Sequence, residues 1–225
     1  PATPPVIHDN TISGVRGDGQ FIGSGIWVYG DVLISDNVIG AAPLPTPLPP
    51  NPPIAFGVTS RDIGVPVVPA TVRSARNRIF GFTVAGIDAE FSSPASRFIA
   101  TGDLITRNGQ GYKLFGGDPH LTGVTAYDNG YADVSVNNAT LTLASSIIGP
   151  AGVEANNGAS CTITDSRGPM AGSAGCGDFQ TSADPAFTGP GDYTLTASSP
   201  LIDAGAAAAP AAGEVDLAGT ARAVV

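Results

Sequence analysis

Charged residues are scarce in this chain, making up 13% of its 225 residues, and long hydrophobic runs are absent. No apolar stretch approaches the roughly 18 residues that a membrane span needs. The formal net charge is -9, so the chain offers little positive charge for the phosphates of a nucleic acid. We therefore expect neither a membrane span nor nucleic-acid binding. The negative net charge does not exclude binding of an acidic polysaccharide, which would require a local cationic patch or a bound metal ion at the contact.

Helix-forming patterns are also lacking, whereas glycine and proline are abundant, with 30 and 20 residues. Methionine and tryptophan occur once each. This profile is typical of a β-rich protein with many turns rather than of a helical bundle. The mean hydropathy is slightly positive, which is sufficient for a buried core.

Cysteine is limited to Cys161 and Cys176, which lie in a segment rich in glycine and serine. We predict a disulfide between them, because other features of the chain are those of extracellular proteins. Two free thiols are the alternative, and a zinc site is disfavoured because no further Cys or His accompanies them at metal-binding spacing. No signal peptide is visible and the chain starts at Pro1, so we expect a mature, trimmed product or a fragment of a longer protein.

One sequence pattern recurs along the chain, in segments such as VIHDNTISG from Val6 and LISDNVIGA from Leu33. One column of the aligned segments is mostly apolar and occupies positions 7, 34, 74, 100, 121, 143 and 163. The column three residues later contains Asn10, Asn37, Asn77, Asp103, Val124, Ser146 and Ser166. Successive segments lie 27, 40, 26, 21, 22 and 20 residues apart, a period at which repeat proteins build one structural unit.

These repeats predict an all-β protein, a parallel β-helix of about seven or more coils. They are rich in β-branched residues and lack the consensus of leucine-rich repeats, which have a similar length. Asparagines stacked at a tight turn can hydrogen-bond along the stack and satisfy backbone groups there. The longest step contains the proline-rich run Pro43–Pro53, which we predict to be a loop inserted into one coil.

A second strand is expected in each coil. Alternate residues of a strand face opposite sides. The expected outward pairs are Trp27/Tyr29, Thr59/Arg61, Asp88/Glu90, Lys113/Phe115, Ser135/Asn137 and Glu154/Asn156. Aromatic rings stack on sugars and cations pair with uronate carboxylates. The predicted substrate-binding residues are Trp27, Tyr29, Arg61, Glu90 and Phe115. The alternative for the Trp27/Tyr29 pair is a hydrophobic patch covered by the proline-rich loop.

The repeats from Val6 to Arg167 resemble the right-handed parallel β-helix of the pectate-lyase-like superfamily. The stretch NGQGYKLFGG, followed by an AYDNG coil, is more narrowly similar to family-9 polysaccharide lyases. In that family the lysine of the motif is the Brønsted base that removes the C5 proton of a galacturonate. The resemblance therefore implies that Lys113 is a catalytic base acting on a uronan-like polysaccharide.

The same family binds calcium through acidic residues on the preceding coil, which here reads TVAGIDAEF. Asp88 matches the last of these acids, whereas Val84 and Ala85 stand where further acids are expected. The resemblance thus implies a calcium site that is incomplete or differently built. A base must also be deprotonated near the working pH, and a metal ion or a neighbouring cation, Arg61 or Arg107, would favour this.

Lys113 and its neighbours also have plainer interpretations. An adjacent Asp88 would raise the pKa of Lys113 and pair with it as a cross-strand salt bridge. Asp88 and Glu90 would alternatively form the acid and base of a glycoside hydrolase, since side chains two apart on a strand face the same way. His8 and His120 lack metal-ligand spacing, and we expect both to be ordinary surface histidines.

The segment DPAFTGPGDYTLTASSPLIDAG (Asp184–Gly205) resembles the closing segment of many secreted bacterial β-helix proteins. It implies an extracellular or cell-surface location. We expect residues 1–176 to form the coils, and residues 177–225 to form the closing coils and an Ala/Gly-rich tail of the same domain.

Two function classes follow from these patterns. The first is a secreted β-helix that engages an acidic polysaccharide, with or without cleaving it by β-elimination, and with calcium as the cofactor to consider. The second is a non-catalytic structural or adhesive β-helix of an extracellular fibre, appendage or cell surface. In the second class, uncapped coils would allow end-to-end self-association.

Overall fold

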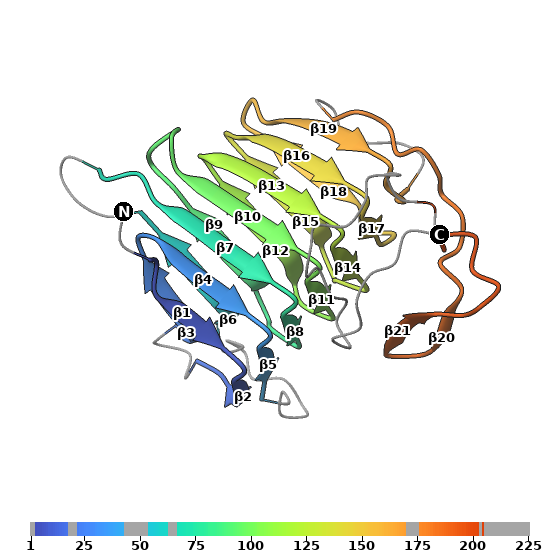
Figure 1. Ribbon diagram of the computed structural model, residues 1–225, viewed down its shortest axis with the longest axis horizontal. Helices are drawn as coiled ribbons and strands as arrows, with labels where there is room; N and C mark the ends of the chain where they lie inside the picture. The colour runs from blue at the N-terminus through green and yellow to red at the C-terminus, as the bar shows by residue number, and fades with distance from the viewer. Residues whose placement is uncertain are drawn as a thin grey trace.

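The protein is a parallel β-helix in which the chain passes through three parallel sheets in turn (Figure 1). The computed structural model describes residues 3–17, 22–42, 54–62, 67–169, 176–202 and 204. The predicted loop Pro43–Pro53 and the predicted tail from residue 205 onward lie outside these residues. No helix within the described residues could cross a membrane.

Each of the first six coils gives one strand to each sheet, and the seventh gives β19 to sheet A. Sheet A contains β1 (Val6–His8), β4 (Val32–Ser35), β7 (Thr71–Ala75), β10 (Arg97–Thr101), β13 (Asp118–Thr122), β16 (Thr140–Ala144) and β19 (Ser160–Thr164). Sheet B contains β2 (Thr11–Val15), β5 (Val38–Ala41), β8 (Arg78–Phe80), β11 (Leu104–Thr106), β14 (Thr125–Tyr127) and β17 (Ile147–Ile148). Sheet C contains β3 (Gly23–Tyr29), β6 (Ala55–Arg61), β9 (Ala85–Glu90), β12 (Gln110–Phe115), β15 (Ala132–Asn137) and β18 (Val153–Asn156).

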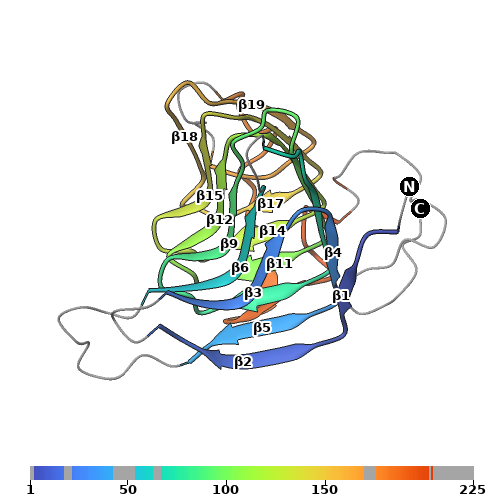
Figure 2. The same ribbon diagram turned by 90° about the vertical axis from the view of Figure 1, so that its left-hand side faces the viewer.

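Seen along the stack, the three sheets enclose one core (Figure 2). The mostly apolar column of the sequence repeats lies in sheet A, where its seven residues pair with one another from strand to strand. Ile34, Leu121 and Leu143 of this column are fully buried. Because neighbouring strands lie about 4.8 Å apart, each inward side chain packs directly on the next. The right-handed sense of the coil stays a prediction from the resemblance.

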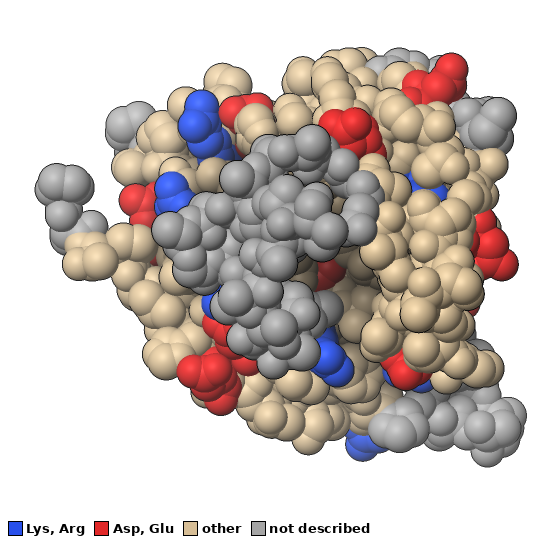
Figure 3. Space-filling view, turned by 45° about the vertical axis from the view of Figure 1, so that its right-hand side comes forward, with Lys and Arg blue, Asp and Glu red and all other residues tan. Residues whose placement is uncertain are grey.

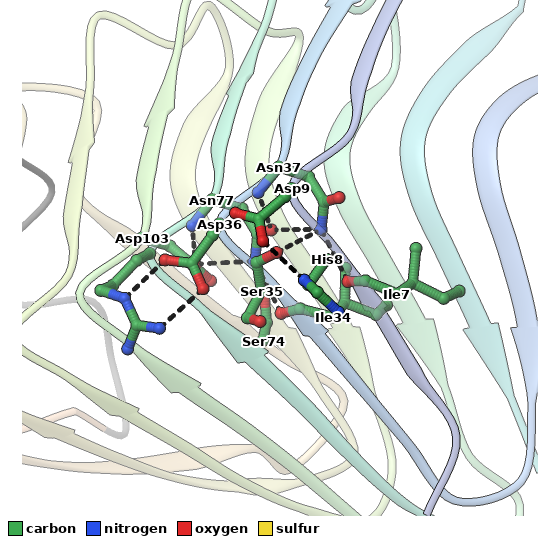
Figure 4. Close-up of polar contacts among 11 residues, drawn as sticks. Ile7, His8, Asp9, Ile34, Ser35, Asp36, Asn37, Ser74, Asn77 and Asp103 are labelled. Carbon is green, nitrogen blue, oxygen red and sulfur yellow. Dashed lines mark hydrogen bonds and ion pairs between the residues drawn. The ribbon is translucent and has the colours of Figure 1, made fainter. Parts of the chain in front are cut away.

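Asparagines form a hydrogen-bonded ladder at the corner between sheets A and B, and Figure 4 shows its members Asn37, Asn77 and Asp103. The amide of Asn10 donates to Asn37 Oδ1 at 3.0 Å, and the amide of Asn37 donates to Asn77 Oδ1 at 2.9 Å. Asn77 in turn donates to Asp103 Oδ1 at 3.1 Å. Each of these accepting oxygens also accepts a hydrogen bond from the backbone N–H of the preceding asparagine. The predicted stack of asparagines is therefore confirmed, and it satisfies backbone groups at the corner.

A residue in the left-handed region precedes each ladder position and turns the chain from sheet A into sheet B. These residues, all with positive φ, are Asp9, Asp36, Arg76, Gly102, Gly123, Ser145 and Asp165. Aspartate and glycine adopt this region more readily than most residues. One residue per coil is thus enough to make the corner.

A second polar ladder at the corner between sheets B and C was not predicted. Asn108 donates to Asn129 Oδ1 at 3.1 Å, and Asn129 donates to Asp133 Oδ1 at 2.9 Å. The amide N–H of Phe82 donates to Asn108 Oδ1 at the other end. Asn108 and Asn129 are each followed by glycine, and this recurrence of Asn-Gly is the sequence signal of the second ladder.

Residues 176–202 cover the last coil. Phe179 is buried against the core, and Gln180 Oε1 accepts the backbone N–H of Ser166, just as Ser166 Oγ accepts the backbone N–H of Ser146 one coil earlier. The predicted disulfide between Cys161 and Cys176 is present and ties this segment to β19. Such a bond is typical of an oxidising compartment.

A hairpin of β20 (Phe187–Gly189) and β21 (Asp192–Leu195) follows in the chain and packs against sheet B. The rings of Tyr127, Phe187 and Tyr193 meet there with centroid distances of 5.0 to 6.0 Å. The outer face of sheet B is therefore partly covered by the chain itself, whereas no such packing involves sheet C among the described residues.

Candidate functional site on the outer face of sheet C

The outer face of sheet C carries all the predicted catalytic, substrate-binding and metal-binding side chains except Arg107. Its predicted strand register is confirmed, including the step after the proline-rich run. One outward column runs through Trp27, Thr59, Asp88, Lys113, Ser135 and Glu154. The neighbouring column runs through Tyr29, Arg61, Glu90, Phe115, Asn137 and Asn156.

Four charged side chains form a closed cluster in the middle of this face. Asp88 accepts from Arg61 Nη2 at 2.8 Å and from Lys113 Nζ at 2.9 Å. Glu90 lies 3.2 Å from the same Arg61 nitrogen and 2.8 Å from Lys113 Nζ. The side chain of Asp88 is only 1% exposed, although its strand position points it outward, because the two cations lie over it. Each cation is thus shared between two carboxylates.

The cluster holds Lys113 in its protonated form. Burial by itself lowers the pKa of Lys113, but hydrogen bonds to Glu90 and Asp88 and their negative charges together raise it above its ordinary value. The salt bridge that the sequence analysis named as the plainer interpretation of Lys113 is present. A general base must lose its proton near the working pH. The predicted role of Lys113 as a base therefore needs a change in this cluster before it can operate.

Glu90 is held in its ionised form. Burial raises the pKa of Glu90, but the hydrogen bond from Lys113 and the charge of Arg61 outweigh it and keep the pKa below its ordinary value. The acid of a glycoside hydrolase needs a raised pKa. Glu90 consequently does not fit the acid of that reaction.

Exposed aromatic rings gather on the same face. Among the described residues, the exposed aromatic side chains are Trp27, Tyr29, Phe115 and Tyr131. The first three belong to strands of sheet C, and Tyr131 immediately precedes β15. Trp27 and Tyr29 lie side by side with ring centroids 6.2 Å apart and are each about half exposed. Both rings are therefore open to a ligand in the described part of the structure.

A groove of about 340 Å³ lies between the charged cluster and the β18 end of the sheet. Its walls are formed by Glu90, Gln110, Lys113, Leu114, Phe115, Tyr131, Ser135, Asn137, Glu154 and Asn156. This volume is at the lower end of the range of about 300 to 1,000 Å³ that is usual for small-molecule sites. The lining is mostly of planar polar groups and aromatic rings.

Tyr131, Gln110 and Glu154 are candidate binding residues that the sequence analysis did not select. Glu154 was placed correctly on the outward face, but it had no charged neighbour that would draw attention to it. Tyr131 lies in the corner before β15, where strand periodicity gives no direction for the side chain. The tyrosine hydroxyl donates to Glu154 Oε1 at 3.0 Å, which joins the two residues.

Arg107 lies on another side of the molecule. It occupies the corner after β11, its side chain is exposed, and its guanidinium stacks 5.6 Å from the centroid of the Phe80 ring of sheet B. Lys113, by contrast, lies on β12 of sheet C. The prediction that Arg107 favours deprotonation of Lys113 therefore stays a prediction.

The calcium ligands expected from the resemblance do not fit the arrangement around Asp88. Both oxygens of Asp88 are engaged by cations, Arg61 on one and Lys113 on the other. Across the part of the chain that the structure describes, no group of three or more His, Cys, Asp or Glu side chains could hold a metal ion.

Opposite charges are also mixed elsewhere on the surface. His120 pairs with Asp118, His8 pairs with Asp9, and both histidines lie at the surface as expected. On the face seen in Figure 3, basic and acidic side chains are scattered among uncharged ones. The site on sheet C differs from these pairs because a buried carboxylate, exposed aromatic rings and a groove occur together there.

Comparison with protein-family models, curated proteins and solved structures finds no match for this chain. The geometry of sheet C is consequently the basis for any statement about function.

Proposed function

We propose that the protein binds a polysaccharide on the outer face of sheet C, outside the cell that secretes it. The observation that carries the proposal is the placement of the exposed aromatic side chains. In the described residues, all four of them lie on or beside sheet C. Aromatic rings offer flat apolar faces to the C–H faces of sugar rings, and solvent-exposed rings cost free energy unless a ligand covers them.

The extended form of the site supports a polymer rather than a single sugar. Trp27 and Tyr29 lie on β3 and the groove reaches β18, at the opposite edge of sheet C. Six strands at about 4.8 Å spacing give a face of roughly 24 Å. The disulfide supports an extracellular location, since such bonds persist in oxidising compartments.

Binding without cleavage is the form of this proposal that the charges favour. The resemblance to family-9 lyases supplies a catalytic form, in which Lys113 removes a proton from a uronate. Lys113 is kept protonated by Glu90 and Asp88, so the charge state works against that step. We therefore propose a binding protein and treat β-elimination as an outcome of the test.

Affinity electrophoresis of the whole chain in gels that contain single polysaccharides tests this function. We expect at least one polysaccharide to retard the protein, and we expect Trp27→Ala to lose most of the retardation. A lyase assay on uronans, with and without calcium, should run beside it with Lys113→Ala. Formation of an unsaturated product by the wild type and not by Lys113→Ala would replace the binding proposal with the lyase.

A structural or adhesive role is the second candidate, and the unequal ends of the coil favour it. Residues 176–202 cover the last coil, whereas Ile7, Ile12 and Val15 of the first coil are only partly buried. An open edge of a β-helix is able to pair with another chain. Light scattering over a range of concentrations tests this role, because self-association through the first coil would raise the mean mass with concentration.

A further inference from the structure

The groove next to the charged cluster has features that select among polysaccharides. It lies over β9, β12, β15 and β18, and Phe115 connects it to the aromatic and charged residues of the first coils through one outward column. The inference below rests on the proposed binding of a polysaccharide to this face and concerns which kind of chain the groove accepts.

Gln110 supplies an acceptor without a partner. Within the described residues, the only buried side-chain nitrogen or oxygen atoms without a hydrogen bond are Gln110 Oε1 and Ser60 Oγ. Of these two residues, Gln110 lines the groove. An unpaired buried acceptor destabilises the protein, and a donor on a ligand would offset that cost. Gln110 therefore lacks a hydrogen-bond donor next to the groove, and a small turn of its side chain would present the buried Oε1 to a ligand hydroxyl group.

The charges of the groove oppose an anion. Its lining contains two carboxylates, Glu90 and Glu154, and one ammonium, Lys113, so its formal charge is -1. Arg61 and Asp88 join the same cluster and cancel each other, which leaves the sum unchanged. Lys113 is shared between Asp88 and Glu90 and has no unpaired charge to offer a uronate. A uronate in the groove would meet net negative charge in place of a free cation.

Glu154 has free acceptor positions to which hydroxyl groups of a ligand can donate. Tyr131 donates to its Oε1 at 3.0 Å, and Ser135 lies at the limit of hydrogen bonding to its Oε2, at 3.5 Å. An ionised carboxylate has about four acceptor positions, so several stay open. The Tyr131 ring is 67% exposed and is held beside the groove by its bond to Glu154. A sugar ring can stack on Tyr131 while its hydroxyls donate to Glu154 and Gln110.

We propose that this groove binds an uncharged sugar unit of a neutral polysaccharide, and that it discriminates against uronans. The sugar donates hydroxyl groups to Gln110 and Glu154 and packs on Tyr131. Discrimination arises because both nearby cations are already paired with carboxylates.

Isothermal titration with cello-, xylo- and manno-oligosaccharides and with oligogalacturonate tests the inference. We expect at least one neutral series to bind and oligogalacturonate to bind at least about tenfold more weakly, a difference of about 1.4 kcal/mol. Tyr131→Ala and Gln110→Ala should each weaken the neutral ligand, by about tenfold for Tyr131→Ala. Val68→Ala is a matched control, because Val68 is 66% exposed and lies outside the groove.

Glu154→Gln separates charge from shape. The variant removes one negative charge and keeps a side chain of the same size, so oligogalacturonate should bind it more tightly than the wild type. A structural role for Glu154 alone would not change the ratio of uronate to neutral affinity. Circular dichroism should show that all variants keep the wild-type fold.

The failures of the two proposals are distinguishable. Preference of the wild type for oligogalacturonate would overturn the inference and leave polysaccharide binding in place. A neutral polysaccharide that binds Tyr131→Ala and Gln110→Ala as tightly as the wild type would also overturn the inference about the groove. If Trp27→Ala abolished that binding, the proposed binding to sheet C would still stand. Absence of binding to every polysaccharide, charged or neutral, would overturn the proposed function itself.

Discussion

Asp88 is the residue on which the charged cluster of sheet C depends. Its carboxylate is 1% exposed and accepts from both Arg61 and Lys113, which are each about one-quarter to one-third exposed. Sequence periodicity placed Asp88 outward but could not predict its burial, because that depends on how two long side chains from adjacent strands bend over it. Because Arg61 and Lys113 both pair with Asp88 in this arrangement, neither offers an unpaired positive charge to a uronate.

Asp88→Asn is predicted to destabilise the protein. The variant leaves Arg61 and Lys113 close together with Glu90 as their one remaining carboxylate. Hydrogen bonds to charged groups contribute about 1.5–3 kcal/mol, and partial exposure of the cations reduces this, so we expect a loss of about 1–2 kcal/mol. Urea unfolding measures it, with the exposed Asp178→Asn as the control. Equal midpoints for the two variants would contradict the structural importance of Asp88.

Asp103 gives the protein an unusual response to pH. Burial raises the pKa of this carboxyl from its ordinary value near 3.8 to about 6, although hydrogen bonds from Ser74 and Asn77 lower it. The folded state therefore binds a proton more tightly than the unfolded state does. The proton on Asp103 therefore stabilises the folded state fully below about pH 4, and this stabilisation is lost as the pH rises through 6.

Asp103→Asn should remove this response, since asparagine is uncharged and keeps the accepting oxygen. Between pH 4 and pH 7 we expect the wild type to lose up to about 3 kcal/mol relative to the variant. Comparing the two proteins at each pH isolates Asp103 from Asp36 and Glu90, whose lowered pKa values act in the opposite direction. Urea midpoints that differ by the same amount at pH 4 and pH 7 would refute this account.

At the scale of the elements, the asparagine ladder links one coil to the next. Asn77 is fully buried and donates to Ile34 O, Ser74 Oγ and Asp103 Oδ1. Asn10 is the first member of the ladder and is exposed. The two residues are chemically identical, so they separate the effect of burial from that of residue type.

Asn77→Ala is predicted to cost several times more free energy of unfolding than Asn10→Ala. Removal of the Asn77 amide leaves the Asn37 amide and the Asp103 carboxyl short of a partner inside the protein. An unsatisfied buried group costs about 1–3 kcal/mol, whereas an exposed one is paired by water. Chemical denaturation of both variants gives the comparison, and similar losses for both would count against a stabilising ladder.

The elements differ in how far the sequence predicts them. Period-two alternation predicts the outward columns of sheet C correctly because a pleated strand allows only two directions for a side chain. The second ladder is marked in the sequence only by the Asn-Gly recurrence at 108 and 129, because its next member, Asp133, lies four residues after Asn129 in the same coil and does not follow the repeat period. Tyr131 escaped prediction because a corner residue has no such two-way constraint. Corners therefore hold the part of the groove that periodicity does not reveal.

At the scale of the whole molecule, the disulfide fastens the segment that covers the last coil. Cys161 and Cys176 are 15 residues apart in the chain, and a loop of this size is associated with about 3 kcal/mol of stabilisation. We expect reduction to lower the thermal midpoint and to increase proteolysis of residues 176–202. The Cys161→Ser, Cys176→Ser double variant should have the thermal midpoint of the reduced wild type, and added reductant should not change that midpoint. Unchanged midpoints after complete reduction would show that the bond adds no stability.

The central claim is that sheet C receives the polysaccharide, and the fluorescence of Trp27 tests it most directly. Trp27 is the one tryptophan of the chain and lies half exposed on that face, so the signal reports on one place. We predict a saturable change in its emission on titration with the polysaccharide that retards the protein in a gel. The midpoint should shift in Tyr131→Ala and stay constant in Val68→Ala. A polysaccharide that binds the protein and leaves the Trp27 emission unchanged would contradict the claim and place the binding site on another face.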